Sequence, residues 1–152
     1  MARLGRQSNA ANRKIVYTAK THTVGGRENG VSRSSDGHLD VKLAVPGSPR
    51  IGTNPEQLFA AGWSACFESA LGLAARKRKI RLTGIVIDAE VDLGLAGADD
   101  YTISARLHIG LPGLERAVAE RLIRDAEQLC PYSKATRGNI DVTLDLLATP
   151  TA

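Results

Sequence analysis

The sequence lacks several features that would define whole classes of protein. It has only two cysteines in 152 residues and no apolar run of the roughly 18 residues that a membrane span needs. Residues 1–12 contain no apolar segment of the kind found in a secretory signal. A chain of this length can bury a core without disulfide staples or a structural metal. We therefore expect a cytoplasmic protein that has no membrane contact.

Metal-ligand spacing is also lacking. The three histidines fall on separate predicted strands, where solvated strand faces explain them: His22, His38 and His108. We expect no metal site.

The net charge of +4 does not indicate a nucleic-acid-binding face. Four of the 20 basic residues stand within residues 1–14, where there is no acid: Arg3, Arg6, Arg13 and Lys14. Without them, 16 basic residues face 16 acidic ones, so the rest of the chain is neutral. A nucleic-acid-binding protein would carry this charge on its folded body, and we expect no such partner.

Patterning divides the chain into a tail and one domain. Residues 1–13 have no periodicity and predict a disordered basic tail, which leaves a single domain over residues 14–148. β-branched or alternating segments predict strands at 14–24, 31–34, 38–45, 85–93, 103–109 and 140–146. Helices are predicted at 53–79 and from 112 until Pro131 stops the second. This order, with hairpin-length links, predicts an α+β fold with mainly antiparallel pairing.

The helix predicted at 53–79 is apolar on nearly every side. Thr53 and Glu56 fit a capping box, with Pro55 in the first turn. The run 76–79 of basic residues complements the helix C-terminus, which is a simpler explanation than an anion site. One sheet can cover only one side of such a helix. We therefore predict an intertwined homodimer in which these helices are central.

Cys66 lies in the middle of this helix, where apolar burial would raise its pKa and make it inert. A reactive thiolate there needs a fixed positive charge nearby. Arg27, in a glycine-flanked turn, is the best candidate, and Glu56 could orient its guanidinium. The alternatives are a solvated turn residue for Arg27 and a helix cap for Glu56.

Helix geometry limits this network. Glu56 and Cys66 are ten residues apart, about 15 Å along a straight helix. Arg27 must bridge them, the site must be completed across a dimer interface, or the helix must bend near Gly62. The sequence leaves these three possibilities open.

Cys130 ends the second helix, immediately before Pro131. A thiol at a helix terminus can move more easily than one in mid-helix, as a resolving thiol must. A core position is the alternative, and two inert buried thiols would be the plainest interpretation of the cysteine count.

Aromatic side chains lie on the Cys66 side of the same helix. They could line an apolar pocket for an alkyl or lipid peroxide, although core packing is the more common explanation: Phe59, Trp63 and Phe67.

Two long motifs carry a resemblance to a known family. They are GTNPEQLFAAG with SACF over 52–67, and CPYS with TRGNI over 130–140, preceded by GGR at 25–27. In these segments the chain resembles the organic hydroperoxide resistance proteins of the OsmC superfamily, and the match extends from Tyr17 to Leu147. Trp63 in place of a tyrosine, and the polar Glu68 and Ser69 after Cys66–Phe67, depart from the family pattern.

The resemblance implies a thiol peroxidase that reduces alkyl and fatty-acid hydroperoxides. It gives Cys66 as attacking thiol, Cys130 as resolving thiol in a disulfide with it, Arg27 as thiolate stabiliser and Glu56 as the carboxylate that orients Arg27. It also implies homodimers with strongly curved sheets around two central helices, no bound cofactor, and reduction by dihydrolipoamide or a lipoylated protein. Rival interpretations are a stress protein of this superfamily that prefers hydrogen peroxide, and a non-catalytic module that binds an apolar ligand.

Overall fold

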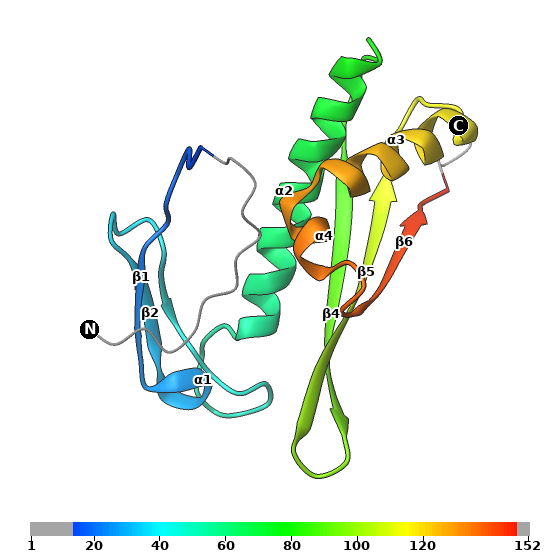
Figure 1. The fold of residues 1–152 in the computed structure, drawn as a ribbon. Helices are drawn as coiled ribbons and strands as arrows, with labels where there is room; N and C mark the ends of the chain where they lie inside the picture. The colour runs from blue at the N-terminus through cyan, green and yellow to red at the C-terminus, as the bar shows by residue number, and fades with distance from the viewer. Residues whose placement is uncertain (1–13, 149–152) are drawn as a thin grey trace. The chain divides into compact units, whose positions relative to one another are not determined.

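The computed structural model describes residues 14–148, and the predicted disordered tail over residues 1–13 lies outside them. The chain divides into two compact units, residues 1–52 and 53–152. Strands and helices follow one another in the order β1, α1, β2, β3, α2, β4, β5, α3, α4, β6 (Figure 1). The α+β prediction is therefore confirmed, with two short helices added. A single domain over residues 14–148 stays a prediction.

The first unit contains a three-stranded antiparallel sheet. Its strands are β1 (Thr21–Val24), β2 (Val31–Ser34) and β3 (Asp40–Lys42), in the order β1-β2-β3. The strands predicted over 14–24 and 38–45 are shorter in the structure. Both strands pair with β2, which has only four residues. All four pair with residues 21–24 on one side, and the first three pair with residues 40–42 on the other. Residues 14–20 form no strand.

A one-turn helix, α1 (Gly26–Asn29), joins β1 to β2. Gly25 and Gly26 adopt positive φ angles of 78° and 62°, a conformation that favours glycine. A methyl group on Gly25 would also come within 2.9 Å of the Gly30 Cα. The predicted glycine turn therefore exists, and Arg27 lies in its single helical turn.

The second unit begins with the long helix α2 (Pro55–Lys77). Its cap is Asn54, whose side chain accepts a hydrogen bond from the Gln57 backbone N–H at 2.8 Å. The capping box predicted for Thr53 and Glu56 is wrong, and Thr53 donates to the Gln57 side chain instead. The reason is Pro55, which disfavours helical geometry at the preceding residue, so Asn54 is extended and caps the helix.

The second sheet contains β4 (Val86–Ala96), β5 (Asp100–Gly110) and β6 (Asp141–Leu146) in that order. β4 and β5 form an antiparallel hairpin, tighter than the predicted 94–100 link because the strands extend to Ala96 and Asp100. β6 pairs parallel to β5, with register Ser104↔Asp141 to Ile109↔Leu146. Within residues 14–148, three of the four strand pairings are antiparallel, as predicted.

The parallel pair requires a crossover, which the two remaining helices provide. These are α3 (Arg116–Leu129) and α4 (Pro131–Thr136). α3 starts later than predicted, because Gly113 at φ 78° cannot continue a right-handed helix. α4 was not predicted, because Pro131 ends one helix and also occupies the first position of the next.

One face of the second sheet meets α2 and α3, and the core lies between them. Figure 1 shows α2 running alongside β4 and α3 crossing over β5. Alternate residues of β5 are buried among helix side chains: Ala105, Leu107 and Ile109. The opposite face is charged, with Arg106 hydrogen-bonded to Glu90 and Asp92 on β4. The intertwined dimer and a central place for α2 stay predictions.

By length and composition alone, α2 could cross a membrane, although the sequence predicted no such span. Six of its side chains are nevertheless buried in the core: Trp63, Phe67, Ala70, Leu71, Ala74 and Ala75. The apolar character of α2 is therefore that of a core helix in a folded domain.

Candidate active site

Cys66 occupies the middle of α2 and is half-buried beside the core. It stands in an unbroken helix, with the fully buried Phe67 as its neighbour. The backbone of Cys66 is therefore held in a regular helix, and only its side chain is left to adjust.

Cys130 is the single extended residue between two helices. Its φ and ψ angles are −65° and 123°, as Pro131 demands of the residue before it. Its N–H donates to the Ala126 carbonyl at 2.8 Å, and its carbonyl accepts from the Lys134 N–H at 3.0 Å. Cys130 thus closes α3 and opens α4 without belonging to either, and its side chain is completely buried.

The fold brings the two cysteines together. Their Sγ atoms lie 3.4 Å apart, although 64 residues separate them in sequence. Both are free thiols in this structure. A disulfide has a sulfur–sulfur distance of about 2.05 Å, so the two atoms need to approach by roughly 1.4 Å to bond. A small side-chain movement can supply this approach, so the geometry allows a disulfide between the two residues.

The surroundings of Cys66 in this unit do not favour its thiolate. Burial raises the pKa of the Cys66 thiol, a backbone hydrogen bond from Tyr132 lowers it, and contact with the Cys130 thiol raises it again. The net direction is upward from the ordinary value of 9.0. None of these three causes is a cationic side chain, so a reactive thiolate requires a positive charge beyond them.

Tyr132 and Ser133 connect the Cys130 segment to α2. The Tyr132 ring packs edge-on to Phe59 at a centroid distance of 6.0 Å and lies against the helix backbone at Gly62. The Ser133 hydroxyl accepts a hydrogen bond from Trp63 Nε1 at 3.3 Å. These contacts hold the first turn of α4 on α2, within about two turns of Cys66.

The two other predicted site residues lie in different units of the chain. Arg27 is half-buried in α1 of the first unit, whereas Glu56 is half-buried in the first turn of α2 in the second. α2 is continuous between Glu56 and Cys66, so about 15 Å separates them along the helix. The roles of Arg27 and Glu56 stay predictions.

The predicted aromatic pocket residues fall into two groups. Trp63 and Phe67 are almost wholly buried in the core, with exposures of 1% and 0%. Phe59 is half-buried and packs edge-on to Trp63 at 5.5 Å. Core packing, the alternative that the sequence left open, describes Trp63 and Phe67. A substrate-lining role for this group stays a prediction.

Over residues 14–148, no group of three or more histidine, cysteine or acidic side chains is placed to hold a metal ion.

Comparison with known proteins identifies the family. The family model for OsmC-like proteins matches residues 46–145. An organic hydroperoxide resistance protein of Xanthomonas axonopodis pv. citri is 47% identical over 142 residues, covering 90% of this chain and 99% of its own. The chain belongs to the OsmC family, among its organic hydroperoxide resistance proteins.

Other organic hydroperoxide resistance proteins agree in sequence and in fold. The Bacillus subtilis protein OhrA is 44% identical over 137 residues, which cover 86% of this chain and 96% of OhrA. The crystal structure of Bacillus subtilis OhrB matches with a TM-score of 0.82 and 41% identity, over 88% of this chain and all of OhrB. An OsmC-family structure from Legionella pneumophila reaches 0.84 at 41% identity, over 89% of this chain and all of its own. Membership in the family places this chain among proteins of hydroperoxide detoxification.

Sequence reasoning identified both thiols but not the residues that hold them together. Tyr132 and Ser133 stand in the CPYS motif, yet their contacts with α2 depend on a fold that joins residues about 70 positions apart. The only feature of the sequence that pointed to these contacts was the presence of a tyrosine and a serine directly after Cys130–Pro131.

Proposed function

We propose that this protein is a cytoplasmic thiol peroxidase that reduces alkyl and fatty-acid hydroperoxides to alcohols. The observation that carries the proposal is the 3.4 Å separation of the Cys66 and Cys130 sulfur atoms, one in a rigid helix and the other at a helix junction. Family membership adds weight, because its relatives are named for resistance to organic hydroperoxides.

The first step is attack of the Cys66 thiolate on the distal oxygen of the hydroperoxide. A sulfur–oxygen bond forms and the oxygen–oxygen bond breaks, leaving a sulfenic acid on Cys66 and an alkoxide that takes up a proton to become the alcohol. Cys66 suits this step because it lies at the edge of the core and is only partly buried, whereas Cys130 is completely buried.

The second step is attack of the Cys130 thiol on the Cys66 sulfenic acid. The product is a disulfide, and the sulfenic oxygen leaves as water. Cys130 suits this step because it is fully buried 3.4 Å from its target, where bulk peroxide does not compete for it. A dihydrolipoyl dithiol then exchanges with the disulfide, which returns both cysteines to thiols and leaves the lipoyl group oxidised.

Arg27 supplies the charge that the thiolate needs, and Glu56 orients it. The need follows from Cys66 itself, because burial raises its thiol pKa and so disfavours attack at neutral pH. Arginine is suited to supply this positive charge, because its charge is permanent and its planar guanidinium can hold a thiolate and a carboxylate together. In this proposal the protein acts as a homodimer, without a resident metal or other cofactor.

Three forms of the protein test the proposal: the parent, Cys66→Ser and Cys130→Ser. With dihydrolipoamide and cumene hydroperoxide, the parent turns over continuously, whereas Cys66→Ser shows no catalysed consumption. Cys130→Ser consumes about one peroxide per site and then stops or over-oxidises, because its sulfenic acid is not resolved. Turnover by Cys66→Ser at the parent rate would refute the assignment.

Substrate and reductant controls complete the experiment. A higher rate with hydrogen peroxide than with cumene hydroperoxide would contradict the preference for organic substrates. Equal turnover with thioredoxin and with dihydrolipoamide would contradict the lipoyl specificity. Slow stoichiometric alkylation of Cys66 at an ordinary thiol pKa, without peroxide consumption, would indicate a binding module instead.

A further inference from the structure

The segment that carries Cys130 is held from both ends of α4 by polar contacts. At its first turn, Ser133 accepts the hydrogen bond from Trp63 of α2. Just after its last turn, Arg137 reaches back to Glu127 of α3, with Nε and Nη2 at 2.9 and 2.7 Å from the same carboxylate oxygen. Arg137 Nη2 also donates to the Glu127 backbone carbonyl at 2.8 Å.

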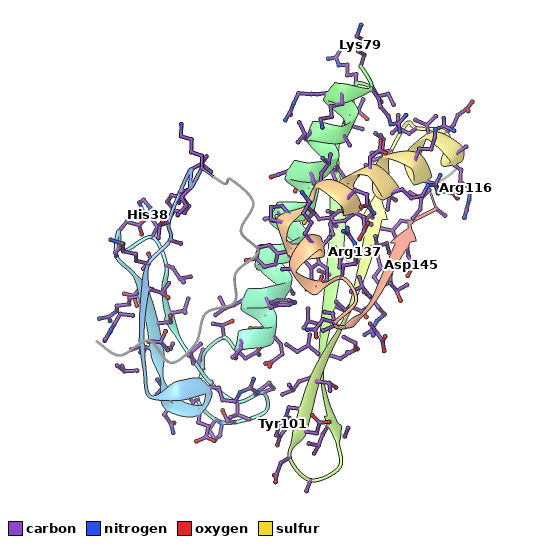
Figure 2. The ribbon with its side chains drawn as sticks, in the orientation of Figure 1. His38, Lys79, Tyr101, Arg116, Arg137 and Asp145 are labelled. Atoms are coloured by element: carbon purple, nitrogen blue, oxygen red, sulfur yellow. The ribbon has the colours of Figure 1, made fainter. Side chains whose placement is uncertain are left out.

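This triple contact closes the chain around Cys130. Glu127 precedes Cys130 by three residues and Arg137 follows it by seven, so the ion pair joins the end of α3 to the end of α4 across the junction. Figure 2 shows Arg137 beside α4, where the chain turns toward β6. Cys130 is the extended residue between the two helices, so the angle between them sets the direction from which its side chain leaves the backbone.

Side-chain packing is incomplete on one side of α4. A cavity of about 230 Å³ lies beside the pair, and its walls include Trp63, Ser133, Thr136 and Arg137. Space on this side would let α4 tilt if the polar contacts were absent. The Glu127 and Arg137 side chains are 25% and 42% exposed, so solvent screens the pair in part.

We propose that the Glu127–Arg137 ion pair is a positioning device that holds the Cys130 thiol in reach of Cys66. It acts through the α3–α4 angle and touches neither sulfur, so both members are positioning residues. Its contribution to resolving a sulfenic acid rests on the function proposed above. Its contribution to the proximity of the two thiols is independent of that function, because proximity also governs disulfide exchange in the absence of peroxide.

Equilibration with glutathione measures that proximity directly. The protein dithiol and oxidised glutathione exchange to give the protein disulfide and two reduced glutathiones, and the equilibrium constant is the effective concentration of one cysteine at the other. Arg137→Gln should lower this effective concentration about fivefold. A change of that size in an equilibrium constant is expected when a partly exposed ion pair is lost. Arg137→Lys, which keeps the charge but not the planar fork, should lie between Arg137→Gln and the parent.

The matched control is Glu120→Gln on the same helix. Glu120 pairs with Arg116 at 2.8 Å, but this pair joins two residues one turn apart and does not reach α4. Figure 2 shows Arg116 at the opposite end of α3 from Arg137. Glu120→Gln should leave the effective concentration within twofold of the parent.

A second measurement tests the link to peroxide chemistry. Under excess hydroperoxide, the fraction of Cys66 driven to sulfinic acid should rise about fivefold in Arg137→Gln, because resolution competes less well with a second oxidation. If Arg137→Gln does not fold, as judged by circular dichroism, Glu127→Gln replaces it in both experiments.

The outcomes separate the two proposals. An unchanged glutathione equilibrium in a folded Arg137→Gln protein, or an equal fall in Glu120→Gln, would overturn the positioning role. A parent protein that consumes no organic hydroperoxide, yet shows the fivefold change in the glutathione equilibrium, would retain the positioning role and refute the peroxidase assignment.

Discussion

Two glycines in the same helix offer a direct test of the contact between Tyr132 and α2. A methyl group on Gly62 would come within 2.8 Å of the Tyr132 Oη and 3.3 Å of its Cζ. A methyl group on Gly72 would meet only Arg76 Nη1, at an ordinary 3.6 Å. Gly62→Ala and Gly72→Ala therefore make the same chemical change in α2. The new methyl group overlaps a neighbouring side chain in Gly62→Ala and overlaps nothing in Gly72→Ala.

The magnitudes separate the two variants. Replacing glycine by alanine inside a helix stabilises it by about 1 kcal/mol, and Gly72→Ala should gain this in full. An overlap in a packed site costs about 1–3 kcal/mol, so Gly62→Ala should be destabilised by about 0–2 kcal/mol overall. Tyr132 is 37% exposed and can turn outward, which favours the lower end of that cost.

Thermal and denaturant unfolding of both variants provide the assay. Gly72→Ala should raise the melting temperature by about 2–4 °C for a chain of this size, whereas Gly62→Ala should not. The protein has one tryptophan, and Trp63 packs against Phe59 beside Tyr132, so its fluorescence should change in Gly62→Ala alone. Equal stabilisation by both substitutions would refute the argument that Tyr132 rests on the helix backbone.

Three further predictions concern the core, the charged sheet face and the thiol. Leu107→Ala, at a fully buried position in the central strand, should cost about 2–5 kcal/mol in urea unfolding, and a loss below 1 kcal/mol would contradict its core role. Hydrogen bonds from Arg106 lower the pKa of Asp92, so the stability they provide is present above the unfolded pKa and lost as pH falls through the folded one. Arg106→Gln should therefore flatten the loss of stability in acid, and an acid profile identical to the parent's would contradict this. Because burial raises the pKa of the Cys66 thiol, Arg27→Gln should move its alkylation profile to higher pH, and an unmoved profile would exclude Arg27 as the activating charge.

Much of the second unit could be predicted from the sequence, because its elements follow simple periodicities. The alternation of residues 103–109 gave the buried face of β5, where Ala105, Leu107 and Ile109 face the helices. The apolar run of α2 gave a long core helix. Both cysteines could be singled out by their settings, one in mid-helix and one before a proline.

The errors occur where a neighbour outside the local pattern decides the structure. The helix cap moved from Thr53 to Asn54 because Pro55 restricts the residue before it. The first strand is short because its partner is short, which the sequence of residues 14–24 does not reveal. The parallel pairing of β6 depends on the route of the crossover rather than on any residue within the strand.

The contacts that hold the thiols together were beyond sequence reasoning for a similar reason. The Trp63–Ser133 hydrogen bond joins residues 70 positions apart, and the closeness of Cys66 to Cys130 depends on how α3 and α4 pack on α2. Neither distance leaves a periodic signal in the sequence. The Glu127–Arg137 pair spans a hinge that was predicted only as the end of one helix.

The parallel pairing of β5 with β6 also has a consequence for how the site is assembled. Cys130 lies on the connection between these two strands, so both ends of that connection are tied down only when residues 141–146 have joined the sheet. Cys66, by contrast, belongs to a helix that is complete much earlier in the chain. A newly made polypeptide would therefore have its first thiol in place well before the second, and the two sulfur atoms would come together only with the final strand.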